Sequence, residues 1–92
     1  MKVKVKFFAP FRDLFEKEEG EFELNSGPNV QGLLDFLCDS EERREKIFDD
    51  SGELRPHVRI LINGLYIKTL DGTQTALEDG DEIAIFPPVA GG

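Results

Sequence analysis

The last seven residues, FPPVAGG, form the most distinctive chemical pattern in the sequence. Pro87 and Pro88 cannot donate to a β-ladder, and they favour a polyproline II conformation that projects the following residues away from a sheet. In that conformation residues 87–92 reach on the order of 18 Å. Gly91 and Gly92 lack a Cβ atom, so this end fits a narrow channel. The pattern predicts an insertable arm that could place its terminal carboxylate against a reactive phosphate or persulfide; a frayed terminus is the alternative.

Other residues capable of chemistry do not assemble into a recognisable active site. His57 is the only histidine, and no neighbouring residue pairs it with Cys38, so we expect structural or surface roles for both. Asp79, Asp81 and Glu82 lack the spacing of a calcium loop and fit a solvated turn better. No Walker-type phosphate loop is present either. We therefore expect no metal site, no bound cofactor and no enzymatic activity within the chain.

Length and charge narrow the function further. The 92 residues fit one domain, and 19 acidic against 11 basic side chains give a net charge of −8. This charge repels nucleic acid, and it is compatible either with solubility alone or with steering toward a basic protein partner. No apolar run approaches the roughly 18 residues of a membrane span, and MKVKVKFF is unlike a secretory signal. We expect a cytoplasmic protein with no membrane partner.

The first part of the chain has the alternation of a β-hairpin. Residues 2–8 alternate lysine with apolar side chains, which predicts a half-buried strand. A helical turn over residues 11–15 then leads to a second strand at residues 21–24. If the strands pair, Glu21 and Glu23 share the outer face with the lysines.

The period then changes from two to about 3.6 residues. An apolar stripe predicts a helix that begins after an Asn29 N-cap, and Gly32 within it makes the helix dependent on packing. The stripe consists of Val30, Leu33, Leu34, Leu37 and Cys38. Residues 41–49 predict a second short helix.

The second half of the chain predicts further strands. Residues 58–62 alternate, Asn63-Gly64 is a strong hairpin signal, and we expect the returning strand at residues 65–70. We expect the last strand at residues 82–86. A helix crossing between these hairpins allows the first and last strands to pair in parallel. The predicted fold is α+β, a β-grasp with a mixed sheet of about five strands and one main helix across one face. We expect this domain over residues 1–86, with residues 87–92 as a flexible tail.

Several segments resemble a known family. Residues 85–92 (IFPPVAGG), together with residues 5–14 and 77–92, resemble the small subunit of molybdopterin synthase and its ubiquitin-like sulfur-carrier relatives. Residues 48–67 resemble the archaeal small ubiquitin-like modifiers, which combine sulfur carriage with conjugation to lysines. The resemblance covers the whole chain.

The resemblance implies a mechanism in which partners supply all the catalytic groups. An E1-like activating enzyme would use ATP to adenylate the carboxylate of Gly92, and a sulfur donor would displace AMP to leave a thiocarboxylate. The molybdopterin synthase large subunit would accept the tail. Phe86, Phe8 and Leu61 are candidates for the docking surface. The alternatives are conjugation to target-protein lysines, sulfur carriage for tRNA thiolation, or a non-carrier β-grasp interaction module.

Overall fold

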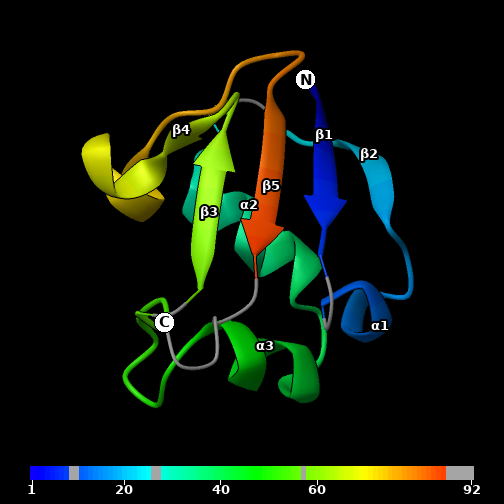
Figure 1. Ribbon diagram of the computed structural model, residues 1–92, viewed down its shortest axis with the longest axis vertical. Helices are drawn as coiled ribbons and strands as arrows, with labels where there is room; N and C mark the ends of the chain where they lie inside the picture. The colour runs from blue at the N-terminus through cyan, green and yellow to red at the C-terminus, as the bar shows by residue number, and fades with distance from the viewer. Residues whose placement is uncertain (9–10, 26–27, 57, 87–92) are drawn as a thin grey trace.

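A five-stranded mixed sheet with helices on one face organises the chain (Figure 1). The computed structural model describes residues 1–8, 11–25, 28–56 and 58–86. The elements are β1 (Lys2–Phe7), α1 (Phe11–Phe15), β2 (Glu19–Glu23), α2 (Val30–Leu37), α3 (Glu41–Ile47), β3 (Arg59–Ile62), β4 (Leu65–Tyr66), the 3-10 helices η1 (Ile67–Thr69) and η2 (Gly72–Gln74), and β5 (Glu82–Phe86).

The sheet has the strand order β2-β1-β5-β3-β4, with β1 and β5 near its centre. These two strands are parallel, with Val5 opposite Ile83 and Phe7 opposite Ile85, as the sequence predicts. The other three pairings are antiparallel. Such a parallel pair requires a long crossover connection, which here contains the helices that cover one face (Figure 1).

The N-terminal hairpin confirms the predicted pairing of lysines with glutamates. Lys2 lies opposite Glu23 and Lys4 opposite Glu21, while Val3 and Val5 are buried on the other face. The second strand begins two residues earlier than predicted, at Glu19, and the first ends at Phe7. Both differences lie at strand ends, where sequence patterns are least exact.

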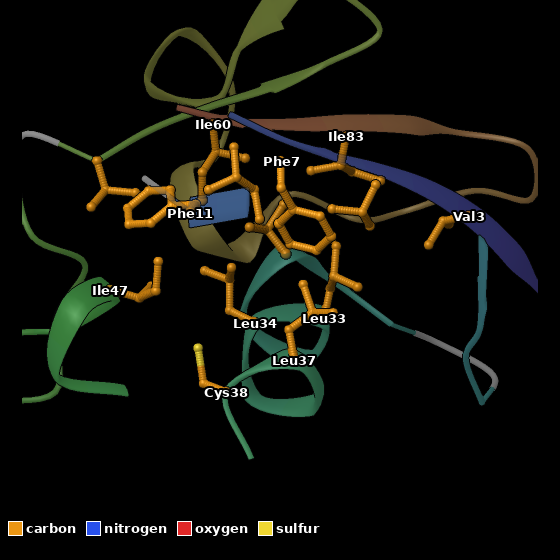
Figure 2. Packing of buried hydrophobic residues seen from close by; sticks show 14 of the residues in the cluster. Val3, Phe7, Phe11, Leu33, Leu34, Leu37, Cys38, Ile47, Ile60 and Ile83 are labelled. Carbon is orange, nitrogen blue, oxygen red and sulfur yellow. The ribbon is translucent and has the colours of Figure 1, made fainter. Parts of the chain in front are cut away.

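Helix α2 packs its apolar stripe against the sheet. The Asn29 side chain accepts a 2.8 Å hydrogen bond from the Gly32 amide, which confirms the predicted N-cap. Leu33, Leu34 and Leu37 extend toward the side chains beneath the sheet (Figure 2). A helix this short is marginal by intrinsic propensity alone, so burial of the apolar stripe is what stabilises it.

Helix α3 confirms the second predicted helix and closes one corner of the core. The Ser40 hydroxyl accepts a hydrogen bond from the Arg43 amide, and the helix carries Glu41 and Glu42 in its first turn. Ile47 at its end is fully buried, and Phe48 follows it into the core. Although α3 is mostly charged, Ile47 at its end therefore packs the helix against the core.

The predicted returning strand over residues 65–70 is largely wrong. Asn63 and Gly64 do form the hairpin turn, with φ values of 50° and 85°. However, β4 ends at Tyr66, and the chain continues as a 3-10 helix. This turn buries Ile67 in the core, and the Thr69 hydroxyl donates a 2.7 Å hydrogen bond to the Tyr66 carbonyl. Burial of Ile67 and this local hydrogen bond compensate for the backbone hydrogen bonds that a longer β4 would have made with β3.

Replacing Leu33 tests whether the helix stripe stabilises the fold. Leu33 is fully buried, so Leu33→Ala should lower the free energy of unfolding by about 2–5 kcal/mol in urea denaturation followed by circular dichroism. Leu65→Ala is the control, because Leu65 is 58% exposed and its loss should cost less than about 0.5 kcal/mol. Equal losses in both variants would contradict the assigned core.

Candidate functional site

The end of strand β5 is the described part of the predicted site. The predictions for Pro87, Pro88, Gly91 and Gly92 concern residues outside the described ranges. Phe86 is the last residue of β5, and it lies opposite Arg59 of β3. On the other side, the Phe8 amide donates a 3.3 Å hydrogen bond to the Ile85 carbonyl. The strand is therefore held from both sides up to its end.

Two of the three predicted docking residues are in direct contact. The rings of Phe8 and Phe86 stack with centroids 4.3 Å apart and planes 10° from parallel. Both residues are partly exposed. Stacking of this kind restricts the rotamers of both rings and adds stability beyond burial alone. The stack gives the end of β5 a defined apolar surface.

The third docking candidate, Leu61, lies on the same outer face of the sheet. It is opposite Ala84 of β5 and opposite Tyr66 of β4. Ala84 is two residues before Phe86 and therefore shares its face. Neither Ala84 nor Tyr66 is among the docking residues predicted from the sequence, although the Asn63-Gly64 turn puts Tyr66 opposite Leu61 and the alternation in residues 82–86 puts Ala84 on the face of Phe86. We call Phe8, Phe86, Ala84, Leu61 and Tyr66 the apolar face.

Charged pairs border the apolar face. Lys6 forms a 3.0 Å ion pair with Glu82, and this hydrogen bond and charge hold the pKa of the Glu82 carboxyl below its ordinary value. Lys4 pairs with Glu19 at 3.1 Å, and the hydrogen bond to Glu19 raises the pKa of Lys4. All four side chains are substantially exposed, so the pairs add little stability. Their effect is to mark the polar rim of the face.

Cys38 packs in the core, as the sequence predicts. Its side chain is 3% exposed and lies beside Leu34 and Leu37 of α2 (Figure 2). Burial raises the pKa of its thiol to about 11, although Arg44 opposes the shift. A buried thiol with a raised pKa is a poor nucleophile.

Asp79 and Asp81, just before β5, accept hydrogen bonds that stabilise the turn. Asp79 accepts a 2.7 Å hydrogen bond from the Lys2 amide, and Asp81 accepts bonds from the Glu78 amide and the Asn63 side chain. Within the ranges that the structure describes, no group of three His, Cys, Asp or Glu side chains could hold a metal ion. His57 lies outside those ranges.

Comparison with known proteins gives the class that this fold and strand end define. The model of the ThiS family matches residues 5–92. The chain is 37% identical to small archaeal modifier protein 3 of Haloferax volcanii, with 100% of both chains covered. It is 33% identical to the molybdopterin synthase sulfur carrier subunit of Escherichia coli, covering 98% of this chain and 99% of the relative. The crystal structure of SAMP1 from Haloferax volcanii superimposes with a TM-score of 0.85, 29% identity and complete coverage of both chains.

The chain belongs to the ThiS family of ubiquitin-like sulfur carriers. The structural likeness confirms the ubiquitin-like β-grasp predicted from the sequence. The relatives are named as sulfur carriers and modifiers rather than enzymes, in agreement with the sequence analysis. No helix among the described residues has the length and apolar character needed to cross a bilayer.

The burial of Cys38 predicts slow alkylation of the folded protein. With a pKa near 11, roughly a thousandth of the thiol is ionised at pH 8, and access is blocked as well. Iodoacetamide should therefore modify the folded protein at least tenfold more slowly than the same protein unfolded in guanidinium chloride, as measured by mass spectrometry. Glutathione calibrates the reagent in both solutions. Equal rates in the folded and unfolded protein would contradict the assignment of Cys38 to the core.

Proposed function

We propose that the chain carries sulfur on the carboxylate of Gly92 for the synthesis of molybdopterin. The observation that carries this proposal is the match of residues 5–92 to a sulfur-carrier family, which includes the FPPVAGG end of the sequence. The position of β5 supports it, because a central strand paired on both sides ends at Phe86, directly before residues 87–92. In this proposal the domain is a rigid base, and the tail is the substrate of other proteins.

The chemistry requires two steps, adenylation of a carboxylate oxygen of Gly92 and then substitution at its carbonyl carbon. A carboxylate is a poor electrophile, so its oxygen first attacks the α-phosphorus of ATP, and pyrophosphate leaves. A hydrosulfide-level donor then attacks the carbonyl carbon; the new C–S bond replaces the C–O bond to AMP, which leaves with the electron pair. The resulting thiocarboxylate is a sulfur nucleophile that can attack a pterin precursor.

The described residues support the proposal that partner proteins supply the catalytic groups. The Cys38 thiol is buried, and Asp79 and Asp81 are engaged in turn hydrogen bonds, so none of these groups is placed to activate a carboxylate. An E1-like activating enzyme would supply ATP chemistry, and the molybdopterin synthase large subunit would receive the loaded tail. Because the apolar face lies beside the end of β5, we assign both dockings to it. Its aromatic centre and charged rim are the composition expected of such an interface.

A second function, protein modification, is favoured by one comparison. The 37% identity with small archaeal modifier protein 3 extends over both whole chains. The adenylate that accepts sulfur is also an acylating agent, and a lysine amine could attack it or a thioester derived from it. The product would be an isopeptide between Gly92 and the ε-amine of a target lysine.

Mass spectrometry of the activated chain tests the carrier proposal. After incubation with its cognate activating enzyme, ATP and sulfide, the protein should gain about 16 Da, because sulfur replaces one oxygen of the terminal carboxylate. Fragmentation should place the gain on Gly92. A variant lacking Gly92 is the matched control and should show no gain.

Two further measurements separate the two candidate functions. Transfer of the sulfur to a pterin precursor by the large subunit supports the carrier role. Gly-Gly remnants on lysines of cellular proteins, dependent on Gly92, support modification. Absence of the mass gain at Gly92 in the intact chain would contradict sulfur carriage.

A further inference from the structure

Strand β2 is the outermost strand on one side of the sheet, and nothing in the described part of the chain pairs with its outer edge (Figure 1). Leu24 and Met1 exchange backbone hydrogen bonds of 2.8 and 3.3 Å. In an antiparallel ladder such pairs alternate, so Gly20 and Phe22 also bond to β1. The N–H and C=O groups of the intervening residues therefore point outward. They belong to Glu19, Glu21 and Glu23.

An aromatic groove lies next to this edge, on the helical side of the sheet. Its volume is about 480 Å³, and residues from β2, α1, α2 and α3 contribute to its walls. Phe36 is 54% exposed, and its ring meets that of Phe22 edge to face at 6.0 Å. The walls include Phe15, Lys17, Phe22, Phe36, Leu37 and Arg43. An exposed phenylalanine beside a hollow is apolar area that a partner can cover.

The β2 edge and the aromatic groove can bind the same segment, because the side chains of an added strand would alternate between the two faces of the sheet. Residues hydrogen-bonded to Glu19, Glu21 and Glu23 would point their side chains to the outer face of the sheet, on which these glutamates lie. The residues between them would point to the other face, toward Phe22 and the groove. One extended segment can therefore satisfy the edge and fill the groove together.

The charges along β2 indicate which side chains an added strand would carry. Glu19 pairs with Lys4, whereas Glu21 and Glu23 form no ion pair within the described residues. On the groove side, Arg43 is neutralised by Asp39 at 2.9 Å and Glu16 at 3.5 Å, and the Lys17 ammonium lies over the Phe22 ring with its charge retained. The outer positions of an added strand thus face carboxylates, and the inner positions face aromatic rings.

We propose that the β2 edge and the adjacent groove bind an extended peptide segment in which lysine or arginine alternates with large apolar residues. This surface lies across β1 from the strand that leads to the tail, so its occupation is independent of the function proposed for Gly92. The segment would belong to a partner protein and would extend the sheet by one strand.

Amide exchange measured by NMR in the intact protein tests this inference. The probe is a capped peptide, Lys-Ile-Lys-Phe-Lys-Val, and its matched control has glutamate in place of each lysine. The lysine peptide should slow hydrogen exchange at the Glu19, Glu21 and Glu23 amides. The amides of Gly20 and Phe22, which already bond to β1, should change little.

Two variants separate the groove from the strand edge. Phe36→Ala should weaken peptide binding roughly tenfold by removing apolar contact area, and the variant should remain folded because the ring is exposed. Glu21→Gln combined with Glu23→Gln should weaken binding and reduce its salt dependence. Leu70→Ala, an exposed apolar change beyond the opposite edge strand, is the control and should leave binding unchanged.

Three results would overturn the proposal. The first is equal slowing of exchange by the glutamate peptide, and the second is no slowing with the lysine peptide. The third is slowing that appears without peptide as protein concentration rises, because it would identify a second copy of the chain as the occupant. Site-specific slowing by the lysine peptide alone supports the proposal.

Discussion

The parallel pairing of β1 with β5 is the interaction on which the rest of the molecule depends. It brings the first and last strands of the domain side by side, although more than seventy residues separate Val5 from Ile83. Their inward side chains, together with Ile60 and the stripe of α2, form the centre of the core. Because a parallel pair requires a crossover, the helices are necessarily placed between the two strands in sequence and against one face in space.

The same pairing creates the candidate docking surface on the opposite face. It sets Phe8, which follows β1, against Phe86, the end of β5, and so stacks two rings that are distant in sequence. Leu61 joins them because β3 pairs with the other edge of β5. The apolar face and the point at which residues 87–92 begin therefore share one strand. A partner that docks on this face is positioned close to the start of the tail.

Features set by neighbouring residues were predicted correctly from the sequence. Some features set by packing between distant parts of the chain were not. The Asn29 cap, the Asn63-Gly64 turn and the burial of Cys38 follow from side-chain chemistry within a few residues. The strand over residues 65–70 failed because burial of Ile67 outweighed continued pairing with β3. The exposed Phe36 was missed because the helix stripe accounts for the residues that face inward, and no local rule marks an aromatic residue on its flank.

We propose that the domain docks through its apolar face while Gly91 and Gly92 enter another protein's active site. The most direct measurement is the steady-state rate of adenylation by the cognate activating enzyme as a function of carrier concentration. Phe86→Ala should raise KM with kcat largely retained, because it removes a docking contact. Gly91→Val should fold normally and compete with the wild-type chain for the enzyme, yet lose turnover, since its side chain obstructs a narrow channel. Normal adenylation of Gly91→Val would contradict the account.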